Sequence, residues 1–166
     1  IAKDKEIDYI TYHDGLTGVY NRNFFNEKIK NIDLQENLPI SIIMGDVNGL
    51  KLTNDAFGHL MGDKLLLSAA NIMKRVCRDS DIVVRWGGDE FIILLPKTKQ
   101  EDVEEISERI KNECIKENVD LLNISISLGY DTKTNKDADI MKSVTNAEEM
   151  MYKIKMLESK SVKSRT

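Results

Sequence analysis

Residues 40–44 read Ile-Ser-Ile-Ile-Met, a short and nearly continuous apolar run that directly follows Pro39. A strand with one wet face alternates apolar and polar residues, so an almost unbroken apolar run is typical of a strand buried on both faces. The chain must therefore fold around this segment. The run predicts a short central strand that ends at Gly45 and Asp46.

The rest of the chain supplies further strands and helices in a clear order. Apolar spacing predicts helices after Asn21, from Asp63 onward, from Thr98 onward and over 140–154, and strands at 82–84, 91–95 and 122–130, the last with one wet face. The two middle strands flank Gly87-Gly88 and read as a hairpin. The order βαββαβα predicts an α/β (α+β) fold with a ferredoxin-like βαββαβ core, added helices and a central sheet rich in antiparallel pairs.

Size and charge limit the function classes. A chain of 166 residues that is 41% hydrophobic can bury one full core, which predicts one domain over residues 14–158. Residues 1–13 are interpreted as a linker or helix end from an upstream region, and residues 159–166 as a frayed tail. The formal net charge of −4 argues against a nucleic-acid polymer as partner, but not against a small phosphorylated ligand.

Cys77 and Cys114 lack CxxC spacing and sit in apolar helical patterns. Reduced, buried thiols are the better interpretation, and they favour a cytoplasmic location. We expect neither a membrane span nor a signal peptide. Because the chain starts at Ile1 rather than Met, we expect a longer protein with an upstream sensory domain, whose attachment to a membrane stays open.

Three carboxylates are expected to meet at one edge of the sheet. Right-handed crossovers place the strand at 91–95 between the strands at 40–44 and 82–84 and antiparallel to both. This order brings Asp46 next to Asp89 and Glu90. Like charges repel at this distance unless a cation lies between them, and Mg²⁺ prefers such hard oxygen ligands. The alternative is that Gly87-Gly88-Asp89-Glu90 is only a turn, since glycine and aspartate are common turn residues.

The residues after Asp46 suggest a nucleotide site. The backbone N–H groups of the segment with Asn48, Gly49 and Leu50 could point at phosphate oxygens, with Lys51 as a positive point charge. A solvated surface lysine is the ordinary alternative.

Asn54 and Asp63 could recognise guanine, because a carboxylate accepts from the N1–H and exocyclic amine that guanine has and adenine lacks. This pair favours GTP over ATP. Alternatively, Asn54 belongs to a turn and Asp63 only caps a helix.

Three motifs give the chain its family resemblance. Residues 14–22 read DGLTGVYNR, residues 46–59 read DVNGLKLTNDAFGH and are followed by Gly62-Asp63, and residues 85–91 read RWGGDEF. In this order and spacing they resemble the GGDEF family of diguanylate cyclases, from about residue 14 to residue 155. The resemblance implies a palm-like nucleotidyl cyclase fold that condenses two GTP into cyclic di-GMP across a homodimer.

The resemblance also implies individual roles. It assigns the metal ion, Mg²⁺ or Mn²⁺, to Asp46, the Val47 carbonyl, Asp89 and Glu90, with Asp89 or Glu90 as the base toward the 3′-hydroxyl. Lys51 and Lys155 would bind phosphates, and Lys51 would also count among the catalytic residues. Asn54 and Asp63 would bind guanine. Arg78 and Asp81, in an RxxD signature, would form an inhibitory site for the product, with Arg109 as a second arginine; ordinary surface charge is the alternative.

Two departures from the family pattern leave the activity open. Asn48 and Leu50 stand where the family often has Asp and Phe, and Glu158-Ser159 replaces the usual Gly-Arg, with Lys160 as a substitute cation. Asn48 removes a negative charge beside the metal. The alternatives to an active cyclase are a weak or inactive domain that serves as a GTP or cyclic di-GMP receptor, and a cyclase with altered nucleotide preference.

Overall fold

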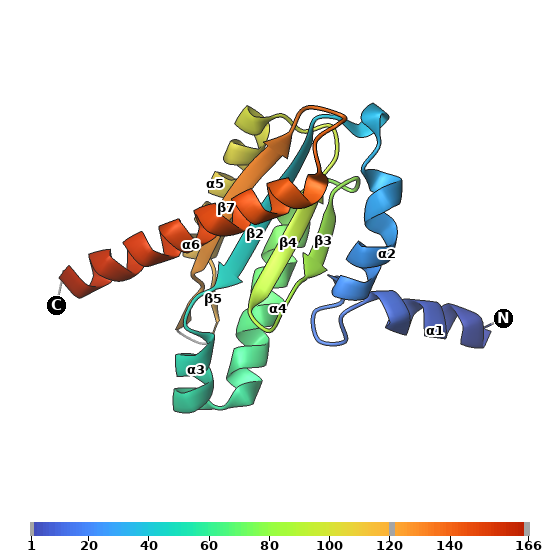
Figure 1. The fold of residues 1–166 in the computed structure, drawn as a ribbon. Helices are drawn as coiled ribbons and strands as arrows, with labels where there is room; N and C mark the ends of the chain where they lie inside the picture. The colour runs from blue at the N-terminus through green and yellow to red at the C-terminus, as the bar shows by residue number, and fades with distance from the viewer. Residues whose placement is uncertain (1, 120–121, 165–166) are drawn as a thin grey trace.

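The computed structural model describes residues 2–119 and 122–164, with side chains described for residues 5–119 and 122–160. Helices surround one central sheet (Figure 1). In chain order the elements are α1 (Ala2–Tyr12), β1 (Tyr20–Asn21), α2 (Arg22–Ile32), the short 3₁₀ helix η1 (Gln35–Asn37), β2 (Ile40–Val47), α3 (Leu50–Phe57), α4 (His59–Val76), β3 (Ile82–Arg85), β4 (Glu90–Leu95), α5 (Gln100–Lys116), β5 (Asn118–Val119), β6 (Leu122–Asn123), β7 (Ile126–Lys133) and α6 (Ile140–Ser164).

Within the described residues, five strands form the central sheet in the order β1-β3-β4-β2-β7. β4 lies between β2 and β3 and is antiparallel to both. β7 pairs antiparallel with the other side of β2, and β1 adds a short parallel pair at the β3 edge. This arrangement confirms the predicted α/β fold with its ferredoxin-like, antiparallel-rich core.

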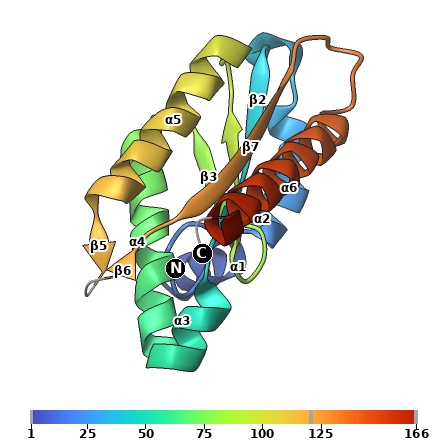
Figure 2. The same ribbon diagram turned by 90° about the vertical axis from the view of Figure 1, so that its left-hand side faces the viewer.

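Helices cover both faces of the sheet, with α4 and α5 on one face and α2 and α6 on the other (Figure 2). All eight residues of β2 are buried, which confirms the predicted strand, although it continues through Val47. Along β2 the side chains alternate between the layers: Ile43 packs in the α4–α5 core, and Ile42 and Met44 pack in the α6 core. This alternation directs Asp46 toward the face that α6 covers.

The strand predicted over 122–130 is confirmed at residues 126–130, as part of β7, but its predicted wet face is wrong. It is divided into β6 and β7, and Ser127 and Gly129 are buried because α6 lies over them. The backbones are so close that a Cβ on Gly129 would lie 2.1 Å from the carbonyl oxygen of Ala147 and 2.3 Å from the amide nitrogen of Met151. The absence of a side chain at Gly129 sets the distance between β7 and α6.

Two predicted helix starts are also wrong. α4 begins four residues before Asp63, with Gly58 as its N-cap at φ +91°, so Asp63 lies inside the helix and does not cap it. α5 follows Lys99, and its N-cap makes no side-chain hydrogen bond. Thr98 instead donates from Oγ1 to the carbonyl of Pro96. Asn21 does begin a helix, since its side chain accepts a hydrogen bond from the N–H of Phe24 at 3.0 Å in α2.

Helix α3 and the short strand β1 were not predicted. None of the eight residues of α3 is buried, and its Leu52 and Phe57 are largely exposed. Helical periodicity is recognised over a window of about 11–18 residues, and α3 has only eight.

At the two ends, helices occupy the predicted linker and tail. α1 covers most of residues 1–13, and α6 continues through Ser164, so residues 159–164 extend the closing helix. Residues 1 and 165–166 lie outside the described residues.

Cys77 and Cys114 are free, and burial raises the pKa of Cys77 to about 12 and that of Cys114 to about 11, so both stay protonated near neutral pH. No helix in residues 2–119 and 122–164 combines the length and apolar composition needed to cross a bilayer.

Candidate active site

Asp46, Asp89 and Glu90 form an acidic cluster at the end of β2. Asp46 is the register partner of Glu90 on β4, so their side chains share the face of the sheet that α6 covers. One carboxylate oxygen from each of the three residues lies within 4.8 Å of the others. The structure thus brings together the carboxylates that the sequence predicted to meet.

The hairpin that carries Asp89 is fixed by backbone and side-chain hydrogen bonds. The carbonyl of Asp89 accepts from the N–H of Val47 at 2.8 Å, which ties the turn to the end of β2. Arg85 donates from Nη2 to the carbonyl of Gly88 at 2.8 Å and from Nη1 to Asp14 at 3.2 Å. The sequence motifs contain Asp14 and Arg85 but predict no role for either residue. These two residues link the N-terminal segment to the turn beside the acidic cluster.

Lys155 is the positive charge at the cluster. Its Nζ donates to Oδ2 of Asp46 at 2.8 Å from α6. Burial and repulsion from Asp89 raise the pKa of Asp46, although the Lys155 ammonium opposes them. Burial and the neighbouring Asp46 carboxylate raise the pKa of Glu90. Burial alone would lower the pKa of Lys155, but the hydrogen bond with Asp46 and the negative charges of Asp46 and Asp89 together outweigh burial and raise that pKa.

The cluster suits a hard cation. Asp46 is 3% exposed, and its Oδ1 has no hydrogen-bond partner among the residues that the structure describes, while Oδ2 is bonded to Lys155. A buried acceptor without a partner is costly, and a divalent cation would satisfy it. The hydrocarbon side chain of Val47 packs in the core and carries no ligand atom. The backbone carbonyl oxygen is therefore the atom of Val47 that could bind a cation.

The segment after β2 has fewer free N–H groups than predicted. The N–H of Asn48 donates to the carbonyl of Ser125 at 2.9 Å, and its side-chain amide donates to Ser125 and Ser127 on the β7 side. The groups that could still bind phosphate are therefore the backbone N–H of Gly49, at φ +75°, and the first turn of α3, which carries Leu50 and the exposed Lys51.

Asn54 and Asp63 lie on neighbouring helices. Asn54, on α3, packs so tightly against Gly62 of α4 that a Cβ at Gly62 would lie 1.8 Å from its Oδ1. Asp63 follows Gly62 and is exposed. Oδ1 of Asn54 is buried and has no hydrogen-bond partner within the described part of the chain. The missing side chain at Gly62 is thus what lets Asn54 occupy this position beside Asp63.

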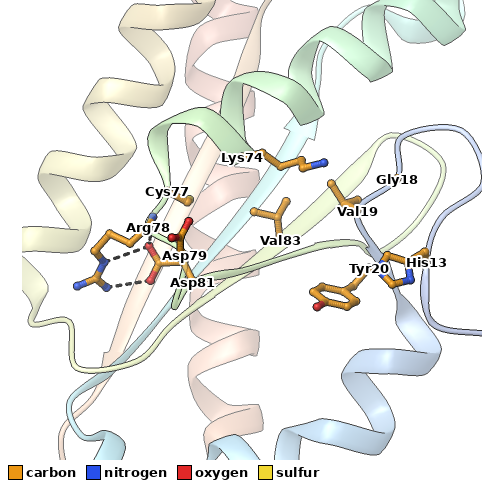
Figure 3. Close-up of a pocket in the computed structure, with 10 residues that line it drawn as sticks. All are labelled: His13, Gly18, Val19, Tyr20, Lys74, Cys77, Arg78, Asp79, Asp81 and Val83. Atoms are coloured by element: carbon orange, nitrogen blue, oxygen red, sulfur yellow. Dashed lines mark hydrogen bonds and ion pairs between the residues drawn. The ribbon is translucent and has the colours of Figure 1, made fainter. Parts of the chain in front are cut away.

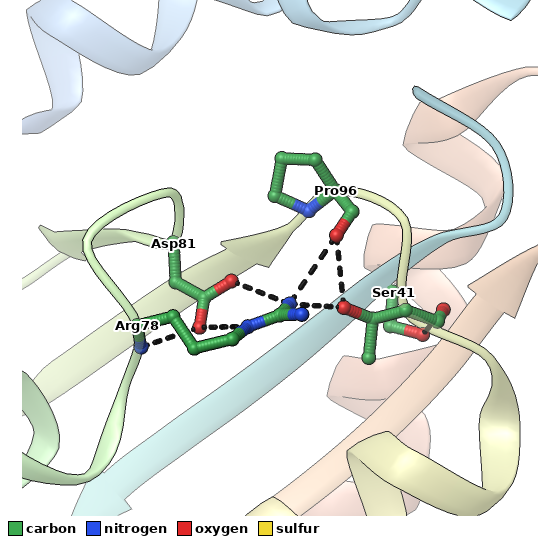
Figure 4. Close-up of polar contacts among 5 residues, drawn as sticks. Ser41, Arg78, Asp81 and Pro96 are labelled. Atoms are coloured by element: carbon green, nitrogen blue, oxygen red, sulfur yellow. Dashed lines mark hydrogen bonds and ion pairs between the residues drawn. The ribbon is translucent and has the colours of Figure 1, made fainter. Parts of the chain in front are cut away.

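Arg78 and Asp81 form an intramolecular clamp (Figure 4). Arg78 donates to the buried Asp81 carboxylate from Nη2 at 2.8 Å and from Nε at 3.2 Å. Its Nη2 also contacts the carbonyl of Pro96 and the hydroxyl of Thr98. These contacts use Nε and Nη2, and 49% of the Arg78 side chain stays exposed.

A pocket of about 280 Å³ lies beside this clamp. Figure 3 shows Arg78, Asp79 and Asp81 on one side of it and His13 and Tyr20 on the other. Arg109 lines a different pocket, together with Arg75 and Glu113 on the α4–α5 surface. The structure therefore pairs Arg78 with Asp81, and the charges of Arg78 and Arg109 both act on the thiol of Cys77.

The chain matches a known family along most of its length. The family profile described as "Diguanylate cyclase, GGDEF domain" matches residues 11–161. YhcK of Bacillus subtilis (strain 168) is 32% identical over 160 residues, which cover 91% of this chain and 45% of YhcK. Diguanylate cyclase DgcM of Escherichia coli (strain K12) is 28% identical over 151 residues, covering 87% of this chain and 37% of DgcM. The chain spans less than half the length of these relatives.

A solved structure has the same fold. The coiled coil and GGDEF domain of DgcB from Caulobacter crescentus, in complex with c-di-GMP, superposes with a TM-score of 0.83 at 22% identity, covering 91% of this chain and 84% of that one. The profile match over residues 11–161 includes the acidic cluster and all three motifs. This chain therefore belongs to the GGDEF family.

Proposed function

We propose that this domain is a diguanylate cyclase that condenses two GTP molecules into cyclic di-GMP with release of two pyrophosphates. The observation that carries the proposal is the acidic cluster, in which three carboxylates from β2 and the β3–β4 hairpin converge within 4.8 Å beside Lys155. Carboxylates gathered at this distance are suited to metal-assisted phosphoryl transfer.

Each residue then has a defined task. Asp46, Asp89, Glu90 and the Val47 carbonyl would hold Mg²⁺ or Mn²⁺, which supplies charge stabilisation at the phosphates and lowers the pKa of a bound hydroxyl. Asp89 or Glu90 would accept the proton of the 3′-hydroxyl.

The nucleotide would extend from the acidic cluster to the α3–α4 pair. Lys51 and Lys155 neutralise the phosphates, and N–H groups at the start of α3, from Gly49 and Leu50, donate to their oxygens. Asn54 and Asp63 would bind guanine through the side-chain amide of Asn54 and the exposed carboxylate of Asp63. Each domain holds one GTP, so a homodimer is required to bring each 3′-hydroxyl to the α-phosphate of the other GTP.

Product analysis tests the proposal. The domain, incubated with GTP and Mg²⁺, is expected to form cyclic di-GMP and pyrophosphate at a rate per domain that rises with protein concentration, because two domains must associate to form the product. In competition, ATP is expected to be a poor substrate. Absence of product over a wide concentration range contradicts the proposal. Calorimetric binding of GTP or cyclic di-GMP without turnover would instead identify a nucleotide receptor.

Gly62→Ala is expected to weaken GTP binding about tenfold, because the new Cβ displaces the Asn54 side chain and removes roughly one hydrogen bond to a charged or polar partner. The end of the Asn54 side chain can move, so the melting temperature should stay nearly constant. Calorimetry with GTP checks both Gly62→Ala and Asn54→Ala, which should behave alike. Asn71→Ala, exposed on the same helix, is the control. Unchanged affinity in Gly62→Ala contradicts the guanine assignment.

We further propose that Arg78 and Asp81 bind the product and inhibit the enzyme, with Arg109 as a second contact. Arg78→Ala is expected to abolish cyclic di-GMP binding and to cost about 1–2 kcal/mol of stability, since the ion pair it breaks is partly exposed. Isothermal calorimetry and thermal unfolding measure the two effects separately. Retained product binding in Arg78→Ala excludes this site.

A further inference from the structure

Helix α6 is held to the sheet by apolar contacts along only its first half. Ile140, Val144, Ala147 and Met151 are buried in the core between α6 and the sheet. Beyond them, Met156 is 61% and Leu157 66% exposed. In Figure 1 this end of α6 projects past the sheet. Polar contacts must therefore orient the turns that carry Lys155.

Two consecutive turns of α6 make such contacts. Nζ of Lys155 donates to Oδ2 of Asp46 at 2.8 Å, and Oε2 of Glu158 accepts from Oγ of Ser127, also at 2.8 Å. Asp46 and Ser127 are register partners on β2 and β7. Residues three apart lie on one face of a helix, so the two contacts fix the same face of α6 to two neighbouring strands.

Glu158 also joins other parts of the domain at this point. Its Oε1 lies 3.5 Å from Nζ of Lys111 on α5. Ser127, its hydrogen-bond partner, accepts from Nδ2 of Asn48 at 3.1 Å, just beyond the end of β2. A glycine, which the family resemblance leads us to expect at position 158, could make none of these contacts.

We propose that Glu158 is a positioning residue that holds the end of α6 against β7, so that the Lys155 ammonium stays at the acidic cluster and reaches the triphosphate of the bound nucleotide. This inference rests on the proposed function, in which Lys155 binds phosphate. Glu158 does not itself contact substrate. Its loss should affect binding of the phosphates and leave binding of the guanine base unchanged.

The test compares two ligands that share the base. An α,β-methylene analogue of GTP carries the triphosphate but cannot be cleaved at the α-phosphate, and guanosine carries none. In calorimetry with Mg²⁺, Glu158→Ala is expected to bind the analogue about tenfold more weakly than the unmodified protein and to bind guanosine equally well. Glu158→Gln, which can still accept from Ser127, should stay within about twofold, because the half-exposed ion pair with Lys111 contributes little.

A second pair of variants tests the contact itself. Ser127→Ala should weaken analogue binding as Glu158→Ala does, and the double variant should be no weaker than either single variant. Glu149→Ala, exposed on α6 in the half that apolar contacts hold, is the matched control.

Each outcome decides between the inference and its alternatives. Unchanged analogue affinity in Glu158→Ala, or an equal loss for the analogue and guanosine with a lower melting temperature, overturns the inference. Failure of the unmodified protein to bind the analogue overturns it together with the proposed function. Selective loss of analogue binding in a protein that makes no cyclic di-GMP would refute the cyclase proposal alone.

Discussion

Asp89→Asn is expected to lower the rate of cyclic di-GMP formation by about a thousandfold or more. A metal-ligand set that loses one negative charge loses several kcal/mol of transition-state stabilisation, and each 1.4 kcal/mol corresponds to about a factor of ten in rate. The fold should not suffer. The carbonyl of Asp89, which accepts from Val47, is unchanged, and one repulsive charge leaves the acidic cluster. Product formation with GTP and Mg²⁺ measures the rate.

Thermal unfolding provides a second measurement on the same variant. Divalent cations are expected to raise the melting temperature of the unmodified domain, because they bind only the folded cluster, and this rise should shrink in Asp89→Asn. Glu105→Gln, an exposed carboxylate on α5, is the charge-matched control and should behave like the unmodified domain in both assays. Normal turnover, or an undiminished response to the cation, in Asp89→Asn would refute the metal assignment.

Gly129→Ala is expected to be the most destabilising single-methyl addition in the sheet, with a cost of about 3 kcal/mol. The added Cβ would lie 2.1 Å from the carbonyl oxygen of Ala147, and backbone atoms cannot rotate away as a side chain can. α6 must therefore move outward from β7. Because α6 also carries Lys155, we expect cyclase activity to fall even at temperatures where the variant stays folded.

Denaturant unfolding of Gly129→Ala measures the stability loss. Gly15→Ala is the control, since a Cβ at Gly15 would meet no atom within 4 Å. A loss below about 0.5 kcal/mol, the range of ordinary surface substitutions, would mean that α6 is held more loosely than the structure indicates.

The sequence was most informative where a segment is buried on both faces. The apolar runs of β2 and β4 predicted their own burial, and the order of the elements predicted their pairing, which placed Asp46 beside Glu90. Burial was predicted wrongly where helices far away in the sequence pack over a segment and decide which of its side chains are exposed. Ser127 and Gly129 read as the wet side of a strand, and only the packing of α6 makes them buried.

The same reasoning explains the site. Asp46, Asp89 and Glu90 were predictable because the register of β2 and β4 pairs Asp46 with Glu90, and Asp89 directly precedes Glu90 in the hairpin. The ion pair between Lys155 and Asp46 depends on where a helix 109 residues later crosses the sheet, so spacing in the sequence could not predict it. Asp63 read as a helix cap because the buried stripe of α4 side chains starts only at Leu65, while Leu60 in the first turn is 81% exposed.

The contrast between β2 and α3 has a consequence for how the site opens. Every residue of β2 is buried, whereas no residue of α3 is. Local unfolding costs least where few apolar contacts are lost, so α3 amides should exchange with solvent long before those of β2. We therefore expect the end of the site that holds the carboxylates to open much less often than the end formed by α3. We expect the opening of α3, the end assigned to the base, to admit the nucleotide and release the product without disturbing the carboxylates.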